Sequence, residues 1–191
     1  VYRRYTPFWE TNTGLRVPTF SFAVLNAYFG FTALTPAENF SDEFLFADRA
    51  IPKYDPTSFL INFYGPSGTF RHIKAADVID DDTFTTNEEA ATGQEINTFS
   101  DPDFGYLYDS TFTGKLVIVG STVPEDHDLF PVAFAGGRQQ GDNLMYGVEL
   151  HANVIESILR DEFLRKQSAL SEILLVIFFS VVTFLVTSSL K

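Results

Sequence analysis

Carboxylates, two imidazoles and one amide follow one another closely in the second half of the chain, in a pattern that suits ligand binding. The candidate ligand-binding residues are Asp126, His127, Asp128, Glu149, His151 and Asn153. Carboxylate oxygens and imidazole nitrogens bind divalent cations such as Zn²⁺ or Mn²⁺. A structural role is the favoured alternative, in which Asp128 bonds backbone N–H groups and His151 is a satisfied, partly buried histidine. The sequence therefore establishes no cofactor, and a divalent cation is the one candidate.

Two predicted elements position these residues. The short apolar run 115–119 stops at Gly120 and is typical of a buried strand. Residues 148–159 have the apolar spacing of an amphipathic helix and include Glu149, His151 and Asn153. Ligands of α/β sheets bind beyond the carboxyl ends of the strands. We therefore expect the loop after the strand and the start of this helix to approach each other.

A weaker candidate site lies in an acidic stretch. Every charged residue from 80 to 109 is an acid. Asp101, Asp103 and Asp109 have a spacing reminiscent of a calcium loop, in which alternate oxygens surround a hard cation. The stretch lacks the bidentate Glu expected three residues after Asp109, where Phe112 stands. A solvated acidic loop is therefore the favoured alternative to a metal site.

Composition excludes several other kinds of chemistry. The formal net charge of −12 argues against a nucleic acid partner, which requires a basic surface. The absence of Cys removes disulfides, thiolate metal sites and cysteine nucleophiles. The run Gly65-Pro66-Ser67-Gly68 is not followed by the Lys-Ser/Thr pair of a phosphate loop, so we interpret it as a plain turn.

The order of the predicted elements indicates an α/β fold. The region 1–17 predicts an antiparallel hairpin that turns at Asn12-Thr13-Gly14. A helix is predicted to begin near Pro18 and to end before Gly30. Further buried strands are predicted at 58–64 and 115–119, and further helices at 73–79 and 148–159. This alternation predicts a mostly parallel sheet with an N-terminal antiparallel hairpin and helices packed on it.

The C-terminal run 169–190 predicts a transmembrane helix. Its one charged residue is Glu172, and a helix of this length spans about 33 Å, enough for a bilayer core. Ser168 suits the N-cap. A buried helix of a soluble protein is the disfavoured alternative, because the run has no polar face. We expect a domain at 1–167 and a membrane helix at 168–190, whose orientation the flanking basic residues do not decide.

Several motifs together carry a resemblance to a known family, namely residues 61–66, 114–122, 128–131 and 147–153, the helix 73–79 and the pair Arg3-Arg4. On these motifs the chain resembles the second CHASE family, the extracellular sensory domains associated with bacterial cyclases and histidine kinases. The predicted membrane helix directly after the domain also fits this family. Two departures are visible: the family's N-terminal part with its preceding membrane helix is missing, and the acidic stretch looks long.

The resemblance implies the sensory domain of a bacterial membrane receptor. The domain 1–167 would lie outside the inner membrane, in the periplasm, and would pass a ligand or stress signal to a cytosolic adenylate or guanylate cyclase or a kinase beyond Lys191. This fragment would then not be an enzyme. Its expected partners are an unidentified small ligand, the membrane through the C-terminal helix and, by analogy with other receptors, a second copy of the chain.

Two other functions remain open at this point. In an extracytoplasmic metal-dependent hydrolase, Asp128 and His151 would hold a metal and a neighbouring acid would act as base. In a non-catalytic envelope interaction module, the acidic stretch would bind a partner.

Overall fold

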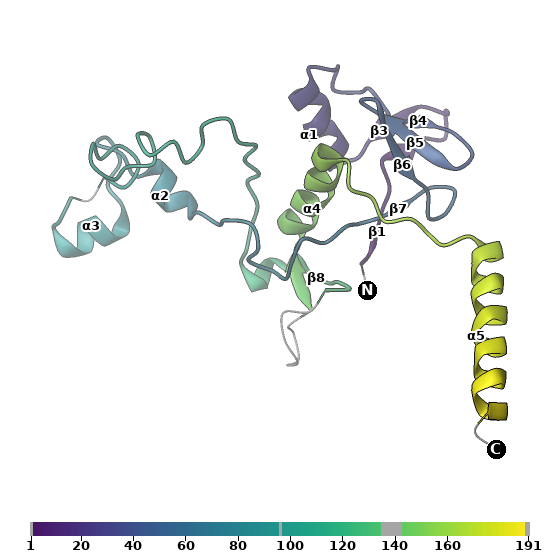
Figure 1. Ribbon diagram of the computed structural model, residues 1–191. Helices are drawn as coiled ribbons and strands as arrows, with labels where there is room; N and C mark the ends of the chain where they lie inside the picture. The colour runs from purple at the N-terminus through teal and green to yellow at the C-terminus, as the bar shows by residue number, and fades with distance from the viewer. Residues whose placement is uncertain (1, 96, 135–142, 190–191) are drawn as a thin grey trace. The chain divides into compact units, whose positions relative to one another are not determined.

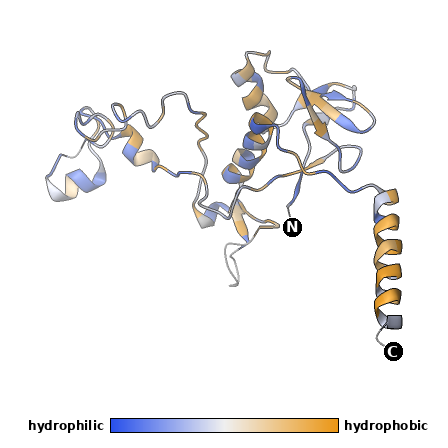
Figure 2. Cartoon of the chain, viewed as in Figure 1, coloured by the Kyte–Doolittle hydropathy of each residue, from blue (hydrophilic) through white to orange (hydrophobic). Residues whose placement is uncertain are grey.

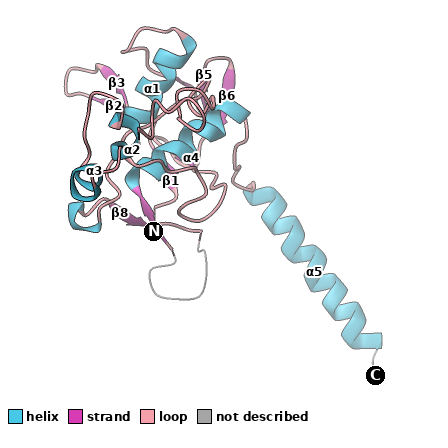
Figure 3. Cartoon of the chain, turned by 90° about the vertical axis from the view of Figure 1, so that its left-hand side faces the viewer, coloured by secondary structure: helices cyan, strands magenta, loops and turns pink. Residues whose placement is uncertain are grey.

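The computed structural model describes residues 2–95, 97–134 and 143–189, which form a mixture of helices and short strands (Figure 1). Long loops connect these elements (Figure 3). The chain divides into two compact units. One contains Val1–Tyr2 and Phe63–Ala152, and the other contains Arg3–Asn62 and Asn153–Lys191.

Three small antiparallel sheets lie in the unit that begins at Arg3. In the first, the predicted hairpin is confirmed, with Trp9 opposite Val17. In the three-stranded sheet, Phe44 lies opposite Ile51. The strand pairs are β1 (Arg4–Tyr5) with β7 (Phe59–Leu60), β2 (Phe8–Glu10) with β3 (Arg16–Pro18), and β5 (Glu43–Phe46) with both β4 (Glu38–Asn39) and β6 (Arg49–Pro52).

Helix α1 (Phe20–Phe29) follows the hairpin, as the sequence predicts. Thr19 precedes it in an extended conformation, and its hydroxyl donates to the carbonyl of Pro7 at 3.1 Å. Gly30 ends the helix with a φ of 73°, a left-handed conformation that costs glycine little. The Gly30 N–H reaches the carbonyls of the last turn, so the chain can leave the helix without losing these hydrogen bonds.

The core of this unit is aromatic. Phe22 and Phe59 are almost completely buried, and their ring centroids lie 6.1 Å apart in an edge-on arrangement. The ring of Phe46 lies 4.9 Å from that of Phe22, again edge-on. Edge-on pairs place the positive rim of one ring against the negative face of the other. The packing of α1 against the strands therefore depends on Phe22.

The other unit contains α2 (Ala75–Ile79), α3 (Asn87–Thr92), the 3₁₀ turn Pro124–Asp126 and the antiparallel pair β8 (Leu129–Pro131) and β9 (Leu144–Tyr146). Thr86 begins α3 through a capping box with Glu89. The N–H of Tyr2 donates to the carbonyl of Pro131 at 2.6 Å, which adds the start of the chain to this unit.

Helix α4 (Gly147–Arg160) follows β9 directly and contains the boundary between the two units. Its apolar residues Val154, Ile155 and Ile158 are buried, which confirms the amphipathic helix expected at 148–159. Asp161 follows the last helical residue. Its φ is 58°, and its N–H donates to the carbonyl of Ile158.

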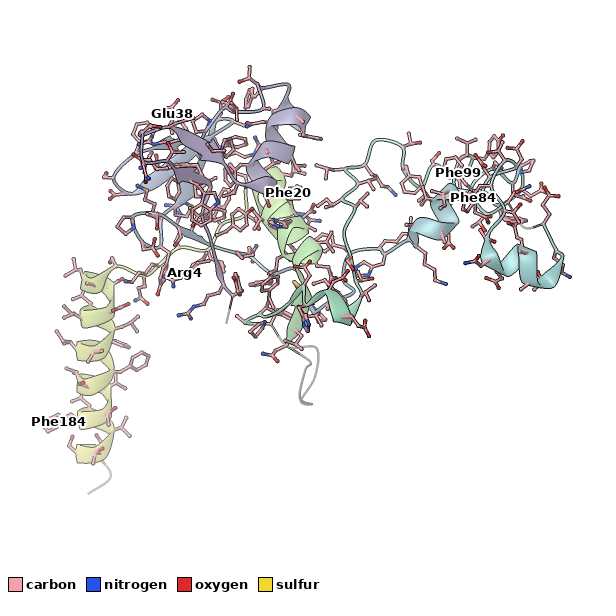
Figure 4. All side chains as sticks on the ribbon, turned by 180° about the vertical axis from the view of Figure 1, so that it is seen from behind. Arg4, Phe20, Glu38, Phe84, Phe99 and Phe184 are labelled. Carbon is pink, nitrogen blue, oxygen red and sulfur yellow. The ribbon has the colours of Figure 1, made fainter. Side chains whose placement is uncertain are left out.

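Helix α5 (Ala169–Ser189) is mostly apolar, and its middle turns are orange in Figure 2. Among the described residues it is the one helix long and apolar enough to cross a membrane, with a mean hydropathy of 2.5. None of its side chains is buried, and Phe184 projects away from the helix (Figure 4). Ser168 caps it, because its hydroxyl accepts the N–H of Ser171 at 3.2 Å. The last residue of the predicted span, Leu190, lies outside the described residues.

The prediction of a mostly parallel sheet is not supported, because the sheets of the described residues are small and antiparallel. The predicted strand at 58–64 is reduced to Phe59–Leu60, which pairs with the N-terminal strand β1. At 115–119 the structure assigns no strand, and Val117 and Val119 are exposed. Short apolar runs indicate burial, but a strand also requires a neighbour for its backbone hydrogen bonds.

The aromatic core yields a stability prediction. We expect Phe22→Ala to lower the free energy of unfolding by about 3–5 kcal/mol, because it leaves a cavity beside Phe46 and Phe59. Phe20 lies on the same helix but is half exposed, so Phe20→Ala is the matched control, with an expected loss below about 1 kcal/mol. Urea unfolding of the chain in detergent micelles measures both. Equal losses would contradict this description of the core.

Candidate functional site

Glu149 is the centre of the site that the structure shows. It lies in the first turn of α4, and its side chain is 2% exposed. The hydroxyl of Ser67 donates to its carboxylate, and the N–H of Gly68 donates to Oε1 at 2.6 Å. A buried carboxylate is stable only when such donors replace its water. The residues 65–68, which we interpreted from the sequence as a plain turn, therefore bind this anion.

His72 is the third partner of Glu149. Its Nε2 lies 3.2 Å from Oε1 of the carboxylate. The imidazole is 42% exposed, so one side of it meets solvent while the other meets a buried acid. When it is protonated, this pair is a salt bridge.

Asp128 lies at the beginning of the same helix. The N–H of Gly147 donates to the backbone carbonyl of Asp128 at 3.0 Å. A Cβ at position 147 would collide with the Asp128 carboxylate, so glycine permits this close approach. A carboxylate at a helix N-terminus is stabilised by the helix dipole. The hydrogen bond to Gly147 uses the backbone carbonyl of Asp128, so the structural role predicted for its carboxylate stays a prediction.

His151 completes the set of titratable groups on the first turns of α4. It is partly buried, and this burial lowers its pKa below the ordinary value of 6.5. The negative charge of Asp128 acts in the opposite direction and raises the pKa. As the pH falls below 6.5, the unfolded chain binds this proton more readily than the folded chain, so His151 reduces the stability at acidic pH.

The end of the apolar run 115–119 also approaches α4. A Cβ at Gly120 would lie 2.8 Å from Cβ of Val148, closer than side chains pack. Gly120 therefore allows the backbone of this segment to contact the first turn of the helix. This contact is made by the segment before the predicted loop, and that segment is not a strand.

The remaining predicted ligand-binding residues have different surroundings. Asp126 and His127 are exposed, and His127 has a left-handed φ of 54° in the turn after Pro124–Asp126. Asn153 is fully buried farther along α4, and its carbonyl accepts the hydroxyl of Ser157 at 2.8 Å. The structure therefore brings Asp128, Glu149 and His151, three of the six predicted residues, to one helix end.

The acidic stretch uses its carboxylates locally. Asp101 Oδ1 accepts the N–H of Asp103 at 2.8 Å, and Asp109 accepts the N–H and the hydroxyl of Thr111 at 2.7 and 2.6 Å. The Thr111 hydroxyl is the main cause that lowers the pKa of Asp109. In residues 2–95, 97–134 and 143–189 no three acid or histidine side chains gather as a metal site. The calcium site predicted at Asp101, Asp103 and Asp109 stays a prediction without structural support.

Sequence reasoning missed three members of the site, namely Ser67, Gly68 and His72. Their signal was weak, because a Gly-Pro-Ser-Gly run is common in turns and the acid that it binds lies 81 residues away from Gly68. The useful clue is Glu149 itself, a charged residue within the otherwise apolar start of a helix. Such an acid requires donors from elsewhere in the chain.

The opposing effects on His151 give a prediction. We expect Asp128→Asn to lower the pKa of His151 further, because it removes the charge that raises it while burial remains. The chain contains three histidines, so ¹³C-histidine NMR over a pH series follows His151 directly. The exposed His127 provides the reference signal. A His151 pKa that stays the same or rises in this variant would refute the interaction.

A comparison with known proteins and protein families identifies the family of this chain. Neither the curated proteins nor the solved structures gave a match to the chain. The family model described as the CHASE2 domain matches residues 1–185, which include Glu149 with its three partners and most of α5. This family consists of extracellular, non-catalytic sensory domains of signalling receptors. The chain therefore belongs to the CHASE2 domain family, as its motifs at 61–66, 114–122 and 147–153 suggest.

Proposed function

We propose that this domain senses a ligand or stress on the outer side of a bacterial inner membrane and controls a cytosolic cyclase or kinase domain through α5. The observation that carries the proposal is the CHASE2 match, which extends from the start of the chain into the apolar helix α5. A sensory domain joined to a helix of membrane-spanning length has a direct covalent route for its signal.

The site supports a specific route within the chain. Glu149 fixes the turn at 65–68 to the first turn of α4, and α4 continues without interruption to Arg160. Only the connector 161–168 separates α4 from α5. A ligand that favours one arrangement of the Glu149 region shifts the population of the arrangements that α4 can adopt. The helix then acts as the lever between the sensed event and the membrane.

The structure favours this reading over the two alternative functions. A metal-dependent hydrolase requires Asp128 and His151 to share a metal with further ligands, and the described residues bring no such set together. The interaction module requires a partner for the acidic stretch, where Asp101 and Asp109 already bond their own turns. The family, in contrast, is sensory.

The coding sequence beyond Lys191 tests the proposal at the least cost. We expect further membrane helices followed by a cyclase or kinase domain. A stop codon directly after Lys191 would contradict control of a cytosolic output domain in the same chain.

The lever also predicts the effect of a flexible insertion. Two or three glycines inserted at Arg165, within the connector, should abolish the response of the full receptor, because they break the mechanical coupling between α4 and α5. The measurement is cyclase or kinase output across external shifts in pH, osmolyte and metal. The control is the same insertion in the exposed hairpin turn at Asn12–Thr13, which should leave the response intact. Normal regulation in the Arg165 insert would refute the lever.

A further inference from the structure

The charge of Glu149 is shielded from water but is not cancelled by its nearest hydroxyl and amide donors. Its side chain is 2% exposed, and the donors Ser67 and Gly68 are neutral groups. Neutral donors lower the cost of burying a carboxylate, but an opposite charge nearby lowers it further. A cation close to this carboxylate therefore strengthens the attachment of the turn at 65–68 to α4.

His72 is placed to become that cation. Its Nε2 is already 3.2 Å from Oε1 of Glu149, so no rearrangement is required when it gains a proton. Its 42% exposure gives protons in the surrounding water access to the ring. Histidine is the side chain whose charge ordinarily changes between pH 5 and 8. The pair thus combines a buried carboxyl group with a solvent-accessible imidazole.

Three other charged or titratable groups of this unit have contacts of their own. Arg71 donates to the hydroxyl of Thr111 at 3.2 Å and lies over the ring of Tyr106. Asp128, beside Gly147 on the same helix, acts on His151. His151 responds to acid in the opposite sense, since its burial disfavours the charged form. Its contribution is therefore separable from that of His72 by substitution.

We propose that His72 and Glu149 form a proton-binding site and that the proton is a ligand of this sensory domain. Acidification protonates His72, and the resulting ion pair clamps the turn at 65–68 to the first turn of α4. At alkaline pH the neutral imidazole leaves this attachment weaker. The inference rests on the proposed sensory function and names one ligand for it. Because Glu149 lies on α4, the clamp acts on the helix that leads toward α5.

The N–H of Gly68 reports the clamp directly, because it donates to Glu149. Hydrogen exchange of the full chain in lipid nanodiscs, corrected for the intrinsic rate at each pH, measures the protection of this amide at pH 5.5 and 7.5. We expect protection roughly fivefold greater at pH 5.5, as suits a partly exposed ion pair. His72→Gln should remove this difference, since glutamine keeps a donor but does not titrate. The matched control is His127→Asn, an exposed histidine outside the pair, which should behave as the wild type does.

Glu149→Gln provides a second, independent variant if His72→Gln fails to fold, and it should also remove the pH difference. Protection that does not change with pH in the wild type would overturn the proposal, and so would an undiminished difference in either variant. Receptor output separates this inference from the proposed function. A response to external pH that survives His72→Gln refutes the proton site and leaves the sensory function intact. An output insensitive to every external condition refutes the sensory function. In that case the hydrogen exchange of the Gly68 amide still tests the proton site by itself.

Discussion

A buried carboxylate in the first turn of α4 is the constraint on which the site depends. Glu149 joins the helix to a turn that is 81 residues away in the chain, through Ser67, Gly68 and His72. Breaking such a group away from its donors leaves an uncompensated buried charge, which costs several kcal/mol. These contacts therefore hold the turn and the helix start together in the folded state.

Small residues make this arrangement possible. Gly147 leaves room for the Asp128 carboxylate, and Gly120 leaves room for Val148. Both glycines lie in the motifs 114–122 and 147–153 that predict the CHASE2 family, and within the residues that the family model matches. The physical meaning of those motifs is close packing around one helix end: glycines where segments approach, an acid that requires donors, and a Ser-Gly turn that provides them. A role in catalysis is not needed to explain any of these residues.

The sequence predicts the local elements of this protein better than their assembly. The N-terminal hairpin, α1 with its Gly30 end, the amphipathic α4 and the apolar α5 follow from spacing and capping within short segments. The mostly parallel sheet was an inference about pairing between distant segments, and the pairs that form are antiparallel. The site shows the same limit. Glu149 and Asp128 were identifiable from residue type, whereas Ser67 and His72 join the site through a long-range contact that no local pattern contains.

Glu149 and the Ser67-Gly68 turn are expected to stabilise the fold as a unit. A double-mutant cycle tests this most directly, with Ser67→Ala, Glu149→Gln and the double variant unfolded in urea at pH 7.5. We expect a coupling free energy of about 1–3 kcal/mol, because each single change removes the same charge-assisted hydrogen bond. Additive effects of the two substitutions, with coupling below about 0.3 kcal/mol, would contradict it.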